Sequence, residues 1–199
     1  MGDKEEIIDD LGIDHYTFIS GDTIDLCAMH PNHAESYARW KNDPLGRRYA
    51  RNVIPRTLDE QKKRFDQRTE TFRDHIAMEI WHKKDSKPIG TIGLGHIDWV
   101  TGWANAYIWI GDKNYWGKNI ATEATKLLLD YAFNELNLHK IHGGVAVDNI
   151  GSWSVAEKLG FTLEGAEREA LYIDGTYVDN KTFCILKEDW TRINKEEKK

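Results

Sequence analysis

Residues 114–124, NYWGKNIATEA, contain a short loop whose composition could hold an anion. The loop Gly117-Lys118-Asn119 lies between an apolar stretch, residues 106–110, and a segment in which apolar residues recur at helical spacing. A helix N-terminus exposes backbone N–H groups that lack partners, and it carries partial positive charge. Glycine lets an anion approach these groups closely, asparagine tolerates left-handed backbone, and lysine adds a full charge. The pattern predicts a phosphate- or pyrophosphate-binding turn between a strand and a helix.

Two common phosphate motifs do not match this loop. A P-loop needs two spaced glycines followed by Lys and then Ser or Thr, and the dinucleotide fingerprint needs three glycines. An ordinary tight turn explains the loop equally well when it is taken alone.

A second stretch, VDNIGSWSVAEKLGF at residues 147–161, also leaves a strand and enters a helix. Asn149 and Ser152 stand at the start of that helix, where capping alone could account for Asn149.

Taken together, YWGKNIATEA and DNIGSWSVAEKLGF resemble the GNAT superfamily of acetyl-CoA-dependent N-acetyltransferases. The similarity is to the subgroup that includes ribosomal-protein N-terminal acetyltransferases and spermidine acetyltransferases. The stretches RWKNDP and EGAEREALYIDGTYVD fit that subgroup too, so the resemblance covers roughly residues 22–190. It implies an α/β (α+β) GNAT fold, in which helices flank a mixed, mostly antiparallel central sheet that is splayed at the coenzyme-binding strand.

The resemblance also implies where acetyl-CoA binds. Backbone N–H groups of the loop and first helical turn would hold the pyrophosphate, the preceding strand would pair with the pantetheine arm, and the second helix start would meet the thiol. Asn114 and Asn119 depart from the family's loop pattern, which has Gln or Arg at the first position and Gly or Ala at the last. The implied cofactor-binding residues are Trp109, Ile110, Gly117, Lys118, Asn119, Ile120, Ala121, Thr122, Asn149 and Ser152.

Acetyl transfer to an amine sets two proton-transfer tasks. A protonated primary amine must lose a proton before it attacks, and the departing thiolate needs a hydrogen-bond donor. The family often places a tyrosine on the second helix, but Ala156 stands at that position here, so Ser152 is the candidate for the thiol. Many relatives carry a glutamate base at the position of Asn105, and an asparagine side chain cannot take a proton.

His96, Asp98 and Glu123 are therefore substitute candidates for the base, and a histidine near its reference pKa suits this task. Alternation along a strand would place His96 and Asp98 on one face. A strand histidine with a structural role, a water chain to solvent, and Glu123 are the alternatives, although stabilising the helix N-terminus would also explain Glu123. The catalytic candidates are Ser152, His96 and Asn105.

Hydrophobic spacing and turn residues predict the elements that position these groups. Capping boxes predict helices over 32–40 and 57–71, with a short extended piece at 48–54. Alternation predicts a three-stranded meander, followed by a helix, a strand, a second helix and a hairpin that turns at Asp174-Gly175. The predicted ranges are 76–81, 89–99, 104–110, 117–136, 139–147 and 150–159. We expect an acidic, partly loose segment at 1–14, a single GNAT domain at 15–190 and a charged tail at 191–199.

Bulk composition narrows the class of protein. The chain has 199 residues, of which 40% are hydrophobic and 30% charged, as in soluble single domains. A net charge of −6 argues against a nucleic-acid partner and is compatible with a cationic ligand or simply with solubility. No apolar run reaches the roughly 20 residues that span a bilayer, and the first residues lack a signal-peptide pattern, so we expect no membrane partner and a cytoplasmic location. Cys27 and Cys184 stand alone, and His139 and His142 would point to opposite faces of a strand, so no metal is expected.

The sequence thus predicts an acetyl-CoA-dependent N-acetyltransferase that moves an acetyl group directly to a primary amine. The acceptor is a protein N-terminus, a polyamine or an amino sugar, with a small amine or a peptide N-terminus favoured. The rival interpretation is a non-catalytic acyl-CoA-binding sensor or partner module of the same fold, motivated by Asn105, Asn114 and Asn119. A homodimer is common in the family and is compatible with this sequence.

Overall fold

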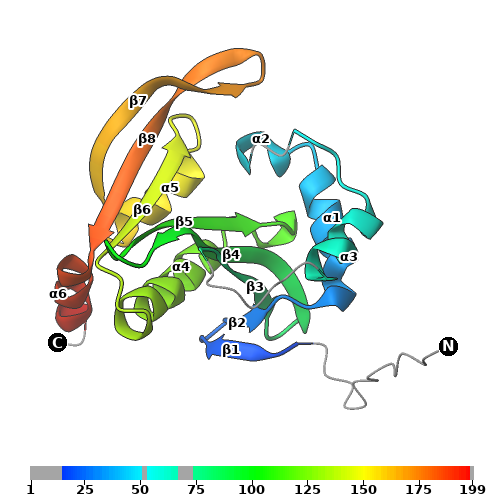
Figure 1. Cartoon of the computed structure of the whole chain (residues 1–199), viewed down its shortest axis with the longest axis horizontal. Coiled ribbons are helices and arrows are strands. Elements are labelled where there is room, and N and C mark those ends of the chain that lie inside the picture. The colour runs from blue at the N-terminus through cyan, green and yellow to red at the C-terminus, as the bar shows by residue number, and fades with distance from the viewer. Residues whose placement is uncertain (1–14, 51–52, 67–73, 198–199) are drawn as a thin grey trace.

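A single eight-stranded sheet organises the chain (Figure 1). The computed structural model describes residues 15–50, 53–66 and 74–197. Neighbouring strands follow the order β1-β2-β3-β4-β5-β6-β8-β7, and every pair is antiparallel except β5 with β6. The mixed, mostly antiparallel sheet that the sequence predicted is therefore confirmed. The strands are β1 Thr17–Ser20, β2 Ile24–Ala28, β3 Ile76–His82, β4 Lys87–Asp98, β5 Trp103–Ile110, β6 Lys140–Ala146, β7 Thr162–Ile173 and β8 Thr176–Leu186.

The N-terminal helices differ in part from those predicted. The capping box at Thr57 and Glu60 is present, with both reciprocal hydrogen bonds, and it opens α3 at Leu58–Asp66. The other predicted box is wrong, because the short helix η1, Pro31–His33, precedes α1, Ala34–Asn42, and the side chain of His30 caps η1 instead. The predicted extended piece at 48–54 is also wrong at its start, where α2 spans Arg47–Ala50.

Two helical layers cover opposite faces of the sheet. On β3, Met78 and Ile80 join the same hydrophobic core as α4, Ile120–Asp130. The intervening Glu79 points the other way, as strand alternation requires, and accepts hydrogen bonds from Tyr37 and His33 beside α1. β5, which carries the predicted site residues Asn105, Trp109 and Ile110, lies between the two layers.

The core lies between the sheet and α4. Apolar residues at helical spacing on α4 are fully buried, and the π-helical turn η3, Tyr131–Glu135, continues the same buried face. Burying side chains of this size contributes about 1.5–3 kcal/mol each. This packing fixes the N-terminal end of α4 against β2, β4 and β5. The buried residues of α4 and η3 are Ile120, Ala124, Thr125, Leu128, Leu129, Ala132 and Phe133.

The C-terminal part builds the far edge of the sheet. α5, Ile150–Lys158, follows β6, and the hairpin of β7 and β8 turns at Asp174-Gly175 as predicted, extending beyond the rest of the fold (Figure 1). The last helix, α6, spans Lys187–Glu197 and continues into the range expected as a charged tail. Trp190, 2% exposed, anchors α6 by donating to Asp130 at 2.8 Å.

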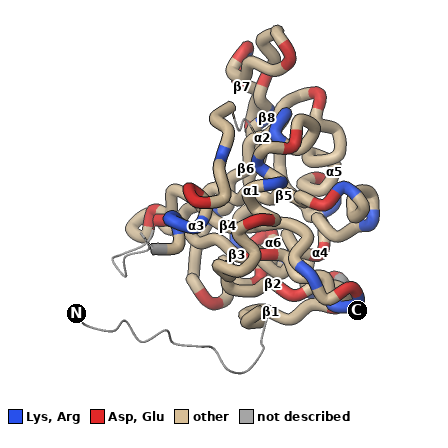
Figure 2. Tube along the Cα trace, turned by 90° about the vertical axis from the view of Figure 1, so that its right-hand side faces the viewer, with Lys and Arg blue, Asp and Glu red and all other residues tan. Residues whose placement is uncertain are grey.

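Acidic and basic residues are interspersed along the trace (Figure 2). The sign of the charge around a site therefore has to be judged locally. Of the helices that the structure describes, none is long and apolar enough to cross a membrane.

Candidate active site

The loop before α4 has left-handed backbone at two positions. Gly117 has φ +72° and Asn119 has φ +62°, so the conformation that glycine and asparagine were expected to permit is present at both. The N–H of Glu123 donates to the carbonyl of Asn119 at 3.1 Å, which leaves the preceding N–H groups of the first turn without an acceptor inside the helix. A Cβ at position 117 would meet no heavy atom of the described chain within 4 Å, so the turn faces open space.

Several contacts hold this loop at the end of β5. The indole Nε1 of Trp116 donates to the carbonyl of Ile110 at 2.8 Å. Asp112 accepts from the backbone N–H of Asn114 at 3.1 Å and pairs with Lys87 at 2.9 Å. The hydrogen bond from Lys87 to Asp112 raises the pKa of that lysine above its ordinary value, so the pair stays charged at neutral pH. These contacts with neighbouring residues fix the loop at the end of β5.

The sheet is splayed beside this loop. β5 and β6 pair only through residues 103–105 and 140–142, although β5 continues to Ile110 and β6 to Ala146. On its other edge, β5 pairs with β4 as far as Ile110. The edge of β5 that faces β6 is therefore open along Trp109 and Ile110, and its backbone can pair with an extended ligand.

The start of α5 faces the same opening. The side chain of Asn149 accepts from the N–H of Ser152 at 3.3 Å, so Asn149 does act as a helix cap. Ser152 is half-buried and lines the opening, and within the described ranges its hydroxyl makes no hydrogen bond. The hydroxyl is consequently available to a bound group.

One large cleft joins these features. Its volume is about 1490 Å³, and it runs from α1 and α3 past β5 to the N-terminal ends of α4 and α5. We call residues 117–122 and 149–152 the α4–α5 wall. The α1–α3 wall comprises the lining residues Tyr37, Lys41, Leu45, Gln61, Arg64 and Phe65.

Comparison with known proteins identifies the family. The model of the acetyltransferase (GNAT) domain matches residues 24–162, which is more than half of the chain. The chain belongs to the GNAT acetyltransferase family. It is an N-acetyltransferase of GNAT fold, and acetyl-CoA is the acetyl donor that this family uses.

Relatives of this GNAT chain include other proteins named as N-acetyltransferases. A Bacillus subtilis protein named as a probable N-acetyltransferase, YjcK, is 38% identical over 138 residues, which cover 67% of this chain and 75% of YjcK. The spermidine N(1)-acetyltransferase of Vibrio cholerae is 32% identical over 145 residues, covering 70% of this chain and 83% of that enzyme. A crystal structure of Vibrio cholerae spermidine N-acetyltransferase with CoA and spermine has a TM-score of 0.79 at 26% identity, covering 86% of this chain and 99% of that one.

The candidate bases occupy different places in the GNAT fold. Asn105 lines the cleft. His96 does not lie among the cleft-lining residues of the described chain; it is exposed, with φ +51°, at an irregularity between Gly95 and Asp98 that breaks the expected alternation. Asp98 accepts from Val100, Thr101 and the Thr101 hydroxyl, and these hydrogen bonds, led by that hydroxyl, hold its pKa below the ordinary value. Asp98 therefore closes a turn and is a poor base.

The side chain of Glu123 is engaged in hydrogen bonds with the backbone of another element. Its carboxylate accepts from the N–H of Thr23 at 2.8 Å and from that of Ile24 at 3.2 Å. These bonds tie α4 to the start of β2, about 100 residues away in the chain. Glu123 therefore serves the fold, as a residue of the first helical turn often does.

A histidine–tyrosine pair in the cleft was missed by sequence reasoning. The phenol oxygen of Tyr107 lies 3.0 Å from Nε2 of His75, and the two rings stack with centroids 5.3 Å apart. Tyr107 shares a face of β5 with Asn105 and Trp109, because strand side chains alternate. His75 precedes β3 and has no motif around it, so only the sheet register brings it to the cleft.

Contacts across the mouth of the cleft come from α2. Arg48 pairs with Asp148, just before α5, at 3.3 Å and with Asp174, in the β7–β8 turn, at 2.6 Å. Tyr49 also donates to Asp148, at 3.3 Å. These contacts join the N-terminal helices to the far edge of the sheet and cover one side of the cleft.

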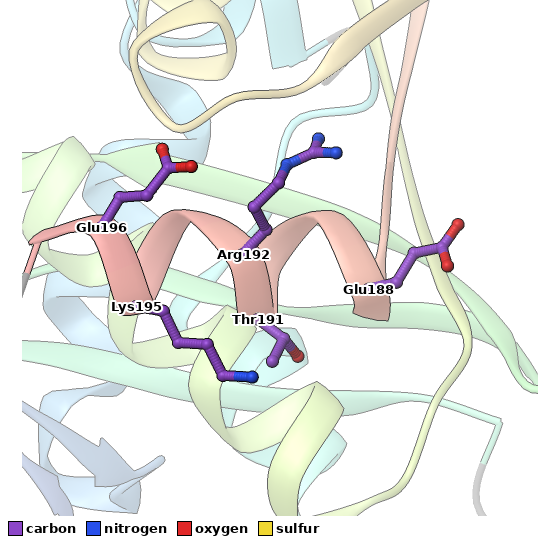
Figure 3. Close-up of a pocket in the computed structure, with 5 residues that line it drawn as sticks. All are labelled: Glu188, Thr191, Arg192, Lys195 and Glu196. Atoms are coloured by element: carbon purple, nitrogen blue, oxygen red, sulfur yellow. The ribbon is translucent and has the colours of Figure 1, made fainter.

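A second depression, of about 490 Å³, lies along α6 and offers no comparable site. All five residues that line it come from that one helix, and their side chains point in different directions (Figure 3). Within the part of the chain that the structure describes, no cluster of His, Cys, Asp or Glu could hold a metal ion. The cleft is consequently the site where we place the chemistry.

Proposed function

We propose that the protein transfers an acetyl group directly from acetyl-CoA to the primary amine of a small molecule or a peptide, within the cleft. The observation that carries this proposal is the juxtaposition of an open β5 edge with a helix start whose N–H groups are free. The first can pair with an extended amide-bearing arm, and the second can bind an anion.

The residues of the α4–α5 wall fit coenzyme A. Backbone N–H groups from Gly117 to Thr122 would donate to the pyrophosphate, and the charge of Lys118 adds attraction. Trp109 and Ile110 would pair with the pantetheine amides at the open edge of β5. Asn119 departs from the family pattern only in residue type, since its backbone is left-handed.

Ser152 is positioned to serve the sulfur atom. Its hydroxyl lies at the start of α5, on the wall opposite the open edge of β5. A hydroxyl donor there would stabilise the thiolate that leaves when the acetyl group departs, and the partial positive charge of the helix start would add to this effect. Ser152 is therefore our candidate for the leaving-group donor.

The proton of the amine needs a route out of the cleft. Asn105 cannot accept it, but Asn105 can orient an amine or a water molecule by hydrogen bonding. Tyr107, next on the same face of β5, could pass the proton to His75, which is exposed to solvent. We place this pair ahead of His96 because both of its members line the cleft.

The acceptor side of the cleft is the face of β5 that carries Asn105, Tyr107 and Trp109. The spermidine acetyltransferases among the relatives support a small amine as acceptor. A non-catalytic acyl-CoA sensor remains the alternative, because Asn105 stands where a base is usual in the family. The two functions differ in whether any amine is consumed.

A thiol-release assay separates these functions. Purified protein is given acetyl-CoA and, in parallel, spermidine, glucosamine, amino acids or short peptides, and free thiol is followed with time. We expect release that depends on one class of amine and a matching mass increase of 42 Da, that of an acetyl group, on that amine. If calorimetry shows that the coenzyme binds but no amine causes thiol release, the sensor interpretation is favoured over the enzyme.

A further inference from the structure

The α1–α3 wall of the cleft carries positive charge that no carboxylate of the described residues neutralises. Lys41 at the end of α1 and Arg64 in α3 both line the cleft, and neither forms an ion pair with any described residue. Among the described residues that line the cleft, the one acidic residue is Glu167, which accepts a hydrogen bond from Asn180 at 2.8 Å. This wall is therefore suited to an anion rather than to a second cation.

The other described Lys and Arg residues of the cleft lie outside the α1–α3 wall. Arg48 is held by Asp148 and Asp174, and Lys118 lies in the loop before α4, 5.3 Å above the ring of Tyr115. Lys158 is at the end of α5, across β5 from α1 and α3 (Figure 1). Among the described residues that line the cleft, Lys41 and Arg64 are therefore the cations of the α1–α3 wall.

Lys41 is held in an unfavourable environment. It is half-buried, and burial, followed by repulsion from Arg64 and Arg56, lowers its pKa to about 8. Reciprocal hydrogen bonds between the side chain of Asn42 and the backbone of Arg56, at 2.7 and 2.9 Å, hold that stretch of chain beside the end of α1. A desolvated cation near other cations costs stability unless an anion compensates it.

Gln61 adds a buried amide to the same wall. It lines the cleft and is only 3% exposed, and among the described residues its Oε1 has no hydrogen-bond partner. That oxygen is closed to solvent, so a ligand reaches it only if the Gln61 side chain turns. Phe65 and Leu45 offer apolar surface on the same wall.

We propose that the acceptor is a carboxylate-bearing amine, an amino acid or acidic peptide, whose carboxylate binds between Lys41 and Arg64 while its amine reaches Asn105 and Tyr107 on β5. This inference rests on the proposed function and narrows its acceptor class. A guanidinium donates two parallel hydrogen bonds to a carboxylate, and such charge-assisted bonds are stronger than neutral ones. A polyamine lacks the anion and is repelled by the same two residues.

Matched acceptors test the preference. Ser-Glu-Ala-amide and Ser-Gln-Ala-amide differ only in one carboxylate, and Ser-Ala-Ala can be compared with its amide in the same way. We expect kcat/KM to favour the carboxylate member of at least one pair by about tenfold or more, the size of one charge-assisted hydrogen bond. Spermidine and glucosamine 6-phosphate complete the panel, and a preference for either of them over the peptides overturns the proposal.

Variants of the α1–α3 wall test whether Lys41 and Arg64 cause the preference for a carboxylate. Lys41→Gln with Arg64→Gln should remove the preference, whereas Lys63→Gln, an exposed neighbour on α3 outside the cleft lining, should keep it. Affinity for coenzyme A should stay the same in the double variant. Loss of coenzyme affinity there would mean that the two cations serve a phosphate of the coenzyme, which also overturns the proposal.

Binding of the products tests the same wall without turnover. The N-acetylated forms of the matched peptides are titrated into the coenzyme A complex by calorimetry, in buffers of different ionisation enthalpy. A carboxylate raises the pKa of Lys41, so at pH 8.5, a value chosen slightly above that pKa of about 8, its binding should take up a fraction of a proton. Equal affinity for both peptides with no proton uptake contradicts the proposal even if the enzyme acetylates amines.

Discussion

The two walls of the cleft are built in different ways. The α4–α5 wall presents backbone N–H groups from six consecutive residues, 117–122, and their geometry follows from a left-handed turn and a helix start. The α1–α3 wall presents side chains from two helices and a loop that are separated in the chain. A backbone site depends on local conformation and tolerates many residue types, whereas a side-chain site depends on each residue and on the packing that assembles it.

This difference suggests which wall binds the coenzyme that relatives share and which wall selects the acceptor that varies among them. A coenzyme that is common to a family suits a wall made of backbone, because sequence can change there without loss of its donors. A wall made of side chains is suited to selecting the acceptor, because one substitution changes the charge of that wall. Substitutions in the two walls should therefore have different signatures, the first in coenzyme affinity and the second in acceptor preference.

The largest effect is expected from Gly117→Asp. The new side chain brings a negative charge to the predicted pyrophosphate site and a Cβ to a residue with φ +72°. Like charges placed together cost several kcal/mol, so the Kd for coenzyme A should rise by about a hundredfold or more. Calorimetry measures this directly. Gly117→Ala is the matched control for backbone strain alone and should bind far better than the Asp variant.

Removing the proton route should have the next largest effect. His75→Gln should lower kcat by about a hundredfold and alter the pH–rate profile if His75 removes the proton, since general base catalysis typically contributes at least this much. His96→Gln, on the same sheet but outside the cleft lining, is the comparison variant. A changed profile in His96→Gln with an unchanged one in His75→Gln would return the role of base to His96.

Ser152→Ala should affect turnover more than binding. Losing one hydrogen-bond donor to the thiolate should reduce kcat by about tenfold, the equivalent of 1.4 kcal/mol, while the Kd for coenzyme A changes little. Steady-state kinetics and calorimetry on the same preparation give both values. An unaffected kcat would leave Ser152 as a residue of the helix start only.

Glu123→Ala should change stability rather than chemistry. Removing the carboxylate leaves the N–H groups of Thr23 and Ile24 without their acceptor, which should cost about 1–2 kcal/mol of unfolding free energy. Urea denaturation measures this loss, and Glu123→Gln, which keeps an acceptor oxygen, should lose less. A shifted pH–rate profile at full stability would instead make Glu123 a base.

Local patterns explain how much of this molecule could be predicted from its sequence. The turn at 117–119, the capping box at Thr57 and the hairpin at Asp174-Gly175 each depend on neighbouring residues, and all three conform to expectation. The position of His75 could not be predicted, because the pairing of β3 with β4 and of β4 with β5 brings it to Tyr107. The same holds for the α1–α3 wall, which depends on the packing of α1 against α3.

Irregularities account for two of the failures. His96 and Asp98 were expected on one face of a strand, but the register shift after Gly95 disrupts the period of two on which that expectation rests. The start of α1 was misplaced because a histidine side chain, which rarely caps helices, caps the start of the short helix that precedes α1. The first error concerns one bulge in a strand that was predicted, whereas η1, α2 and α6 were not predicted as helices.

The most direct test of the account is a crystal structure of the protein with coenzyme A. We predict that pyrophosphate oxygens accept hydrogen bonds from the N–H groups of the first turn of α4, that the pantetheine arm pairs with β5 at Trp109 and Ile110, and that the sulfur lies beside Ser152. A coenzyme bound with its phosphates at Lys41 and Arg64 instead would exchange the roles of the two walls and contradict both the proposed function as drawn here and the acceptor assignment.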